Sequence, residues 1–323
     1  MRAVLCESYG PPEDLVVAEV ADLEPSPGHV VVRVRAAAVN FPDVLLIDGK
    51  YQIKIPPPFT PGSELAGEVI AVGEGVSLAP GQRVSATTFV GGFAEQALLP
   101  AAGLTEIPDG VDFASAAAFG VTYRTAYHAL RSIAEVREGD WVVVLGAAGG
   151  VGLAAVDLAV AMKARVLAAA SSPEKLELCR QRGAEATVDY DREDLKTRIR
   201  ELTGDGARSV LDPVGGAYAD PALRALARGG TFVTLGYAAG AIPSIPLNLV
   251  LLKGITVRGM EIRTFMSDRP DDNARDMREL TEMFASGVVR PYIGARFPLD
   301  DTAAALRLVA DRKAIGKVVV EIP

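Results

Sequence analysis

A glycine-rich turn constrains this chain more than any other feature. Residues 142–152 read VVVLGAAGGVG, so an apolar run leads into glycines at positions 146, 149 and 152. Glycine permits backbone angles that other residues resist, and without a side chain it lets a phosphate approach the main chain. A helix starting there would offer free N–H groups and a partial positive charge to the anion. The pattern predicts a strand, a turn and a helix that bind a dinucleotide; the alternative is a packing turn without a ligand.

Apolar runs alternate with helical segments on both sides of this turn. We expect a helix over 114–130, then strands over 141–145, 165–170, 186–189, 208–211, 231–235 and 255–259, with helices over 173–182, 192–202 and 218–227. This alternation indicates a parallel sheet whose two faces are covered. Short Val-rich runs separated by Gly and Pro fill the first third and indicate a β-rich domain. A helix over 272–286 and a strand over 317–322 are expected to fold back onto that domain.

The composition excludes several classes of protein. A net charge of -8 with no run of Lys or Arg argues against a nucleic-acid partner. The N-terminus has no apolar core of signal-peptide length, and two distant cysteines fit a reducing compartment, so we expect a cytoplasmic protein. The apolar stretch 141–162 could mimic a membrane span, but its four glycines favour a strand, a turn and a buried helix. No membrane partner is expected.

The residues after the second strand indicate which dinucleotide binds. An NAD site usually places Asp or Glu at the end of this strand to hold the ribose 2′-hydroxyl. Here the strand ends in Ser171 and Ser172, with Lys175 one helical turn further on. Hydroxyls and an ammonium suit a 2′-phosphate, which predicts NADPH rather than NADH. Alternatively, Ser172 is a plain N-cap for the helix opening at Pro173 and Lys175 is a solvated lysine; Ser172 could also do both.

Residues that bind metals are scarce. The chain has two histidines, His29 and His128, two cysteines, and no CxxC or HxxxH spacing. A catalytic zinc needs three converging ligands and a structural zinc commonly uses four cysteines, so no metal is expected. The hydride acceptor must then be one that needs no metal to polarise it. Quinones and double bonds conjugated to carbonyls meet this requirement, because hydrogen-bond donors can stabilise the oxyanion that forms.

Several motifs resemble the zinc-independent quinone oxidoreductase branch (the zeta-crystallin-like proteins) of the medium-chain dehydrogenase/reductase superfamily. The resemblance covers nearly the whole chain, and its motifs are Val39–Asp43, Pro61–Gly73, Gly81–Val84 with Gln82 in place of the usual Asp, and Ala147–Gly152. Residues 49–62 look most like the quinone oxidoreductase-like protein 2 subgroup. In zinc-dependent relatives, Cys stands at the position of Asn40 and His at that of Ser63.

The resemblance implies an α/β fold, in which a Rossmann parallel sheet is inserted into a β-rich chaperonin-10-like (GroES-like) domain. We expect the β-rich catalytic domain at 1–118, completed by 262–323, and the NADPH-binding Rossmann domain at 119–261. Dimers of this family join through the last Rossmann strand. Leu247–Leu252 and Ile255–Gly259 supply an apolar edge here, so a homodimer is expected.

The resemblance also assigns roles to individual residues. Tyr51, Asn40 and Thr125 are expected at the reacting end, with Asn40 and Thr125 near the nicotinamide and the Tyr51 phenol bonding the acceptor carbonyl. Some relatives carry a second tyrosine there, where this chain has Leu45. The residues expected to contact the cofactor are Asn40, Thr125, Ala148, Gly149, Gly150, Val151, Gly152, Ser172, Lys175, Tyr190, Gly236, Tyr237 and Lys317.

The expected function is NADPH-dependent reduction of a quinone without zinc. A second enzymatic interpretation is the reduction of an enone or of an enoyl or acryloyl-type thioester, which uses the same hydride donor. A third interpretation, of another class, is a non-catalytic NADPH-binding sensor or RNA-associated protein. The acidic net charge opposes the RNA version, because RNA binding usually needs a basic surface.

Overall fold

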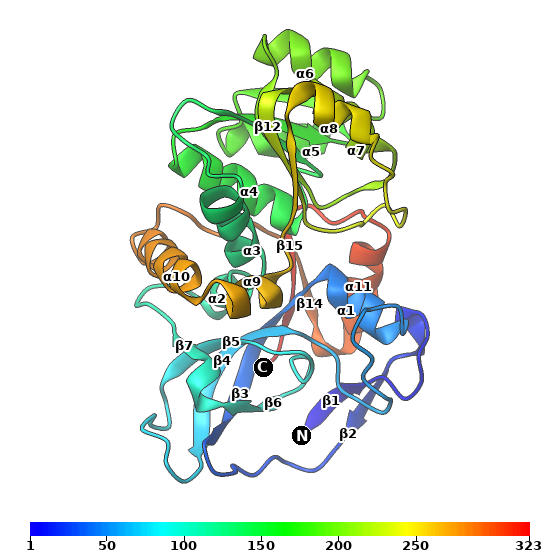
Figure 1. The fold of residues 1–323 in the computed structure, drawn as a ribbon. Helices are drawn as coiled ribbons and strands as arrows, with labels where there is room; N and C mark the ends of the chain where they lie inside the picture. Colours follow the sequence, from blue (N-terminus) through cyan, green and yellow to red (C-terminus); the bar gives the residue numbers. More distant parts are fainter. The chain divides into compact units, whose positions relative to one another are not determined.

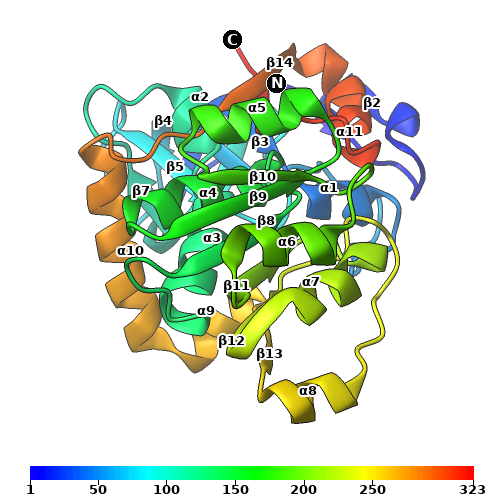
Figure 2. The same cartoon turned by 90° about the horizontal axis from the view of Figure 1, so that it is seen from above.

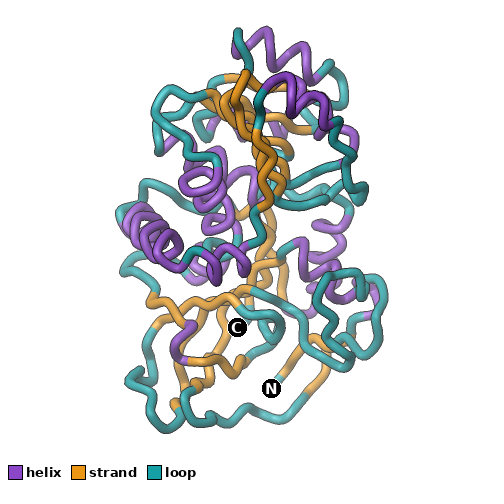
Figure 3. Tube along the Cα trace, viewed as in Figure 1, coloured by secondary structure: helices purple, strands orange, loops and turns teal.

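The computed structural model describes residues 1–323, which divide into two compact units (Figure 1). The first unit contains residues 1–121 and 290–323, and the second contains residues 122–289. The β-rich unit is therefore built from both ends of the chain, and the other unit is inserted into it. Figure 3 shows the strands and helices of each unit.

The first unit is a β-rich domain. Its main sheet has the order β14-β15-β3-β4-β5-β7, β6 also pairs with β3, and β1 and β2 form a separate pair. Its strands are β1 (Arg2–Leu5), β2 (Val16–Glu19), β3 (His29–Val39), β4 (Glu64–Val72), β5 (Arg83–Thr87), β6 (Gln96–Pro100), β7 (Leu104–Glu106), β14 (Ile293–Pro298) and β15 (Lys317–Glu321). Its helices are α1 (Phe41–Ile47), α2 (Phe113–Ala117) and α11 (Thr302–Ala310), with 3-10 turns η1 (Pro12–Asp14), η2 (Ala101–Gly103) and η5 (Leu299–Asp301).

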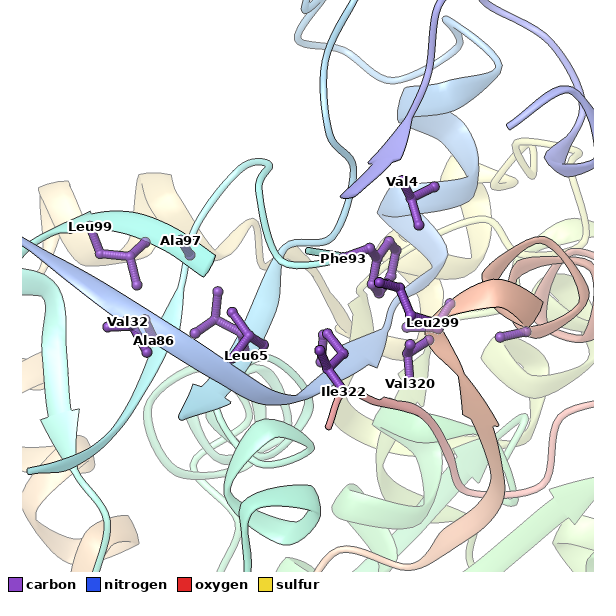
Figure 4. Packing of buried hydrophobic residues seen from close by; sticks show 14 of the residues in the cluster. Val4, Val32, Leu65, Ala86, Phe93, Ala97, Leu99, Leu299, Val320 and Ile322 are labelled. Atoms are coloured by element: carbon purple, nitrogen blue, oxygen red, sulfur yellow. The ribbon is translucent and has the colours of Figure 1, made fainter. Parts of the chain in front are cut away.

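One apolar core joins the two ends of the chain in this unit. Val32 of β3 and Leu65 of β4 pack in the same cluster as Phe93, Val320 and Ile322 (Figure 4). The strand β15 pairs antiparallel with β3, so the last strand of the chain lies beside an early one. Burying such side chains contributes about 1.5–3 kcal/mol each, and this burial holds the C-terminal segment in place.

The second unit is built on a six-stranded parallel sheet of order β10-β9-β8-β11-β12-β13, seen with its helices in Figure 2. In order of appearance along the chain, these strands run 3-2-1-4-5-6, which is the Rossmann order. The strands are β8 (Trp141–Leu145), β9 (Arg165–Ala170), β10 (Ala186–Asp189), β11 (Ala207–Asp212), β12 (Leu226–Thr234) and β13 (Thr256–Gly259). The helices are α3 (Thr122–His128), α4 (Gly150–Ala161), α5 (Pro173–Gln181), α6 (Leu195–Thr203), α7 (Ala219–Ala225), α8 (Leu247–Lys253), α9 (Ile262–Asp268) and α10 (Pro270–Ala285), with the π turn η3 (Ala129–Ile133) and the 3-10 turn η4 (Gly216–Tyr218).

The expected fold class is confirmed, because a Rossmann sheet is inserted into a β-rich domain. None of the helices has both the length and the apolar character that crossing a bilayer requires.

The second division between the compact units falls after residue 289, whereas the expected domain boundary lies between residues 261 and 262. Residues 262–289 belong to the second unit, because α10 packs against α3 and η3. The Asp276 carboxylate accepts hydrogen bonds from the Ser132 hydroxyl (2.6 Å) and from Nδ1 of His128 (2.8 Å), and all three side chains are buried. Because histidine and serine both bind the carboxylate, this buried cluster ties helices together rather than forming a nucleophile–base pair.

Three expected elements also differ in detail. The helix expected over 114–130 is two helices, α2 and α3, separated at 118–121, with η3 after them. Residues 247–252, expected at the sheet edge, form most of helix α8, and β13 is the edge strand. The strand β12 starts at Leu226, earlier than expected, so α7 ends at Ala225. The last two differences arise where apolar residues fit either a strand or a helix and packing selects between them.

Candidate active site

The glycine turn lies between β8 and α4, as expected. Gly146 has φ +58°, a left-handed conformation that side chains rarely adopt. A Cβ at Gly152 would press against the Gly146 carbonyl oxygen and lie 2.8 Å from the Ala147 Cα, so this helix packs close to the turn. Gly149 is different, because its φ of -81° is open to any residue and a Cβ there would meet only the Gly146 oxygen, at 3.3 Å. Backbone conformation and packing therefore explain why Gly146 and Gly152 are glycines. They do not explain why residue 149 is a glycine.

The first turn of α4 is suited to an anion. Gly149 is the N-cap of this 12-residue helix, and no side chain caps it. Gly149, Gly150 and Val151 stay partly exposed, whereas Ala148 and Gly152 are buried. Exposed N–H groups at the positive end of a helix are a ready binding site for a phosphate.

The turn between β9 and α5 brings together the residues predicted to bind the 2′-phosphate. Ser172 is the N-cap of α5, and its hydroxyl accepts a hydrogen bond from the Lys175 N–H (3.3 Å). The Lys175 ammonium donates to the Ser171 hydroxyl (3.2 Å). Tyr190 follows β10, the neighbour of β9, and its N–H donates to the Ala170 carbonyl (3.2 Å). The capping role of Ser172 is thus confirmed, and the phosphate role of the group stays a prediction.

Tyr218 is a residue that sequence reasoning missed in this region. Its ring lies 4.1 Å from the Tyr190 ring at an interplanar angle of 38°, and its hydroxyl donates to Asp191 (2.7 Å). The contact between the two rings restricts the orientation of the Tyr190 side chain. Local sequence carries no signal for it, because Tyr218 lies in η4 after β11, which is three positions from β10 in the sheet.

Loops at the carboxyl ends of the central strands meet beside the glycine turn. A Cβ at Gly146 would lie 2.6 Å from Val214, which follows β11, and one at Gly215 would lie 2.9 Å from the ring of Tyr237. Tyr237 follows Gly236 after β12, and 38% of it is exposed. In a Rossmann sheet, ligands bind outside these strand ends, at the point where the strand order reverses. Thr125, on α3, is partly exposed.

In the first unit, Asn40 and Lys317 form a buried polar cluster with Glu64. The Lys317 ammonium donates to the Asn40 Oδ1 (2.6 Å) and lies 3.2 Å from the Glu64 carboxylate, to which the Asn40 Nδ2 also donates (3.1 Å). Asn40 follows β3, Glu64 begins β4 and Lys317 begins β15, so three paired strands bring these residues together. All three are at most 4% exposed.

Glu64 is the second functional candidate that the sequence did not reveal. Its other oxygen accepts the Val121 N–H (2.7 Å), at the last residue of this unit. One carboxylate therefore compensates a buried ammonium, fixes the orientation of the Asn40 amide and anchors a backbone segment. Removing one partner of such a buried pair leaves an uncompensated charge and costs about 3–5 kcal/mol.

This cluster does not fit a zinc ion. At the two positions where zinc-dependent relatives carry Cys and His, the chain has Asn40 and Ser63. The Glu64 carboxylate already binds the Lys317 ammonium, and the neighbouring Asp43 carboxylate accepts the Asn40 N–H. A fixed positive charge at this point opposes a metal cation. The residues of this cluster are therefore unsuited to binding a metal ion.

Tyr51, the remaining predicted site residue, lies in the turn after α1. Its N–H donates to the Leu45 carbonyl (3.0 Å), and the residue is partly exposed. Its predicted contact with the acceptor carbonyl stays a prediction.

Asp43 lies beside this cluster and is fully buried on α1. Its Oδ2 accepts the Asn40 N–H (2.8 Å), which ties the helix to its N-cap. Burial raises the pKa of Asp43 from 3.8 to about 6, although the Ser63 hydroxyl, the Asn40 N–H and the Lys317 charge oppose this shift.

We expect Asp43→Asn to remove a pH-dependent loss of stability. The folded state binds the Asp43 proton more tightly than the unfolded state does, so this contribution is full below about pH 4 and is lost as pH rises through about 6. The advantage of the variant over wild type should grow across this window by on the order of 3 kcal/mol. Denaturant unfolding at several pH values measures it, with Asp48→Asn, at the C-cap of the same helix, as the control. Parallel wild-type and Asp43→Asn profiles would contradict the prediction.

Comparison with known proteins identifies the family. Residues 26–109 match the alcohol dehydrogenase GroES-like domain family, and residues 150–285 match the zinc-binding dehydrogenase family. The quinone oxidoreductase-like protein 2 homolog of Nematostella vectensis is 39% identical, over 99% of this chain and 88% of that protein. The quinone oxidoreductase of Pseudomonas aeruginosa is 36% identical, over 97% of each. This chain belongs to the quinone oxidoreductase branch of the medium-chain dehydrogenase/reductase superfamily.

The solved structures agree with this assignment. Escherichia coli quinone oxidoreductase complexed with NADPH has a TM-score of 0.91 and 27% identity, and the match covers 99% of this chain and 100% of that chain. The resemblance stated from the sequence is thus confirmed for this quinone oxidoreductase family member, including its likeness to the quinone oxidoreductase-like protein 2 subgroup.

Proposed function

We propose that this quinone oxidoreductase family member binds NADPH and reduces a quinone without a metal ion. The observation that carries the proposal is the pair of anion-suited turns at the ends of β8 and β9. One presents the uncapped first turn of α4. The other bonds the Ser171 hydroxyl to the Lys175 ammonium and the Ser172 hydroxyl to the Lys175 N–H. The names of the similar proteins, and the NADPH complex of one of them, support it.

Each half of the cofactor has a proposed set of contacts. The turn formed by Ala148 to Gly152, with the free N–H groups at the start of α4, would hold the pyrophosphate. Ser172, Lys175 and Tyr190 would surround the 2′-phosphate and its ribose. Thr125, Gly236, Tyr237, Asn40 and Lys317 would contact the nicotinamide half. When bound, NADPH would supply the hydride.

The chain's own residues would orient the reactants and stabilise charge. Lys317 and Glu64 leave the Asn40 amide one orientation, with its oxygen toward the ammonium and its nitrogen toward the carboxylate. A side chain fixed in this way costs little further entropy when it orients a ligand. The Tyr51 phenol would donate a hydrogen bond to the acceptor carbonyl oxygen, where negative charge develops.

The deciding experiment is acceptor profiling with chelator-treated protein. NADPH oxidation is followed with a quinone, an enone and an enoyl thioester, and bound metal is measured in the same sample. We expect turnover with the quinone at substoichiometric metal. Turnover of the enone or the thioester alone would make the protein an enone or enoyl reductase, and NADPH binding without turnover would favour a sensor. A stoichiometric zinc that turnover requires would overturn the proposal.

We also propose a homodimer that joins through β13. This strand is the edge of the Rossmann sheet, and beside it α8 exposes Leu247, Leu251 and Leu252 by 77%, 82% and 63%. The unpaired edge of β13 can hydrogen-bond to the same strand of a second copy of the chain, and the exposed leucines beside it can pack against their counterparts. The acidic charge and two buried free cysteines support a cytoplasmic protein with no nucleic-acid or membrane partner.

The double variant Leu251→Asp/Leu252→Asp should shift the protein from dimer to monomer, because two carboxylates would be buried at the interface. Light scattering coupled to gel filtration measures the mass. Leu98→Asp, at a 39% exposed leucine of the first unit, is the control and should stay dimeric. A wild-type monomer would refute the proposed assembly.

A further inference from the structure

Arg124 is a partly buried arginine with no partner in the protein. It lies on α3, its Nε is inaccessible to solvent, and neither a hydrogen bond nor an ion pair reaches it. Other arginines around this helix are paired. Arg131 binds Glu279, Arg182 binds Asp157, and Arg275 binds Asp276. Arg124 is thus an exception among the arginines of this region.

A partly buried guanidinium without a partner lowers the stability of the folded protein. Burial is the cause that lowers the pKa of Arg124, and no carboxylate acts to raise it. The chain carries 41 Asp and Glu against 33 Lys and Arg, so a lack of acidic residues does not explain the missing partner. Charged groups are rarely buried unless they are paired, and an unpaired one indicates that a bound ligand compensates it.

The position of Arg124 links it to the proposed chemistry. The preceding residue, Tyr123, is buried and donates its hydroxyl to Asp157, which fixes α3 against α4. Helix α4 is the helix that begins at the glycine turn. The next residue, Thr125, is the one proposed to lie near the nicotinamide, and like Arg124 it is partly exposed. Arg124 therefore belongs to the partly exposed stretch of α3 that includes the residue proposed to contact the nicotinamide.

We infer that Arg124 binds the oxyanion that forms on the acceptor when it is reduced. The inference rests on the proposed function, in which the pyrophosphate is assigned to the α4 turn and the 2′-phosphate to Lys175. The acceptor oxygen, to which only the neutral Tyr51 phenol is assigned, is therefore the anionic group without a cationic partner. The quinone gains two electrons and a proton as hydride, NADPH is oxidised to NADP⁺, and the oxyanion then takes a proton from water to complete the hydroquinone. Guanidinium N–H groups stabilise this oxyanion by charge-assisted hydrogen bonds.

The variants Arg124→Met and Arg124→Lys test the inference, with Arg131→Met as a control on the adjoining η3 segment. For Arg124→Met we expect kcat/KM for a quinone to fall by roughly 100-fold, the size of effect seen when one oxyanion donor is removed. The Kd for NADPH should not change, and Arg124→Lys should recover part of the rate. Thermal stability of Arg124→Met should be equal to or above that of wild type, because an unpaired and partly buried charge is gone. The control should keep its kcat/KM.

A second readout uses a sulfonated naphthoquinone as an anionic probe. It should raise the Tm of the wild-type NADP⁺ complex and leave that of Arg124→Met unchanged. An unchanged kcat/KM in Arg124→Met would overturn the inference. A weaker NADPH affinity with unchanged kcat would also overturn it, because Arg124 would then bind an anionic group of the cofactor and not of the acceptor. A wild-type protein that oxidises no NADPH with any quinone would instead overturn the proposed function, before any variant is compared.

Discussion

The variant Lys175→Ala should bind NADPH roughly 30-fold more weakly than wild type and bind NADH equally well. The ammonium lies 3.2 Å from the Ser171 hydroxyl at the end of β9, where no acidic residue stands. A hydrogen bond to a charged group contributes about 2 kcal/mol, which corresponds to this change in Kd. The 2′-phosphate is present only on NADPH, so the loss should be selective for it.

Equilibrium titration of both cofactors measures the effect. Ser171→Ala should show a smaller loss with the same selectivity, because a neutral hydroxyl contributes less than an ammonium. Lys196→Ala, at an exposed lysine of the next helix, removes the same charge from the protein and should leave both affinities unchanged. Equal losses for NADPH and NADH in Lys175→Ala would refute the assignment of the 2′-phosphate to this turn.

Gly152→Ala should have the largest effect on stability. The added methyl group would press into the Gly146 carbonyl and lie 2.8 Å from the Ala147 Cα, and backbone atoms cannot move aside as a flexible side chain can. Overpacking of a tight core typically costs 1–3 kcal/mol, and a backbone clash should reach or exceed about 3 kcal/mol. NADPH binding should be lost with it, because the turn and the start of α4 must separate. Thermal unfolding and NADPH titration measure the two losses.

Gly149→Ala separates the phosphate role from packing. The methyl group would meet only the Gly146 oxygen, at 3.3 Å, and φ of -81° suits alanine, so stability should fall by at most about 1 kcal/mol. The affinity for NADPH should nevertheless fall roughly tenfold or more, because the methyl group stands where the pyrophosphate would approach the helix N-terminus. Wild-type affinity in a stable Gly149→Ala protein would favour the alternative of a packing turn without a ligand.

Local features of this protein could be predicted from the order of its amino acids. The glycine turn, the N-cap at Ser172, the parallel strands and the family motifs all depend on torsion preferences and periodicity within short segments. Residues 262–289 show what short segments do not determine. Their helical spacing was evident, but the surface that their helices cover depended on Asp276 meeting His128 and Ser132.

The polar cluster of the first unit shows the same limit at the candidate site. Lys317 meets Asn40 across 277 positions of the chain, and Glu64 joins them because β3, β4 and β15 pair side by side. The missing partner of Arg124 is likewise a property of everything that packs around α3. Torsion preferences act between neighbours in sequence, whereas charge compensation and burial act between neighbours in space. The first kind of information is present in any short segment, and the second exists only once the chain has folded.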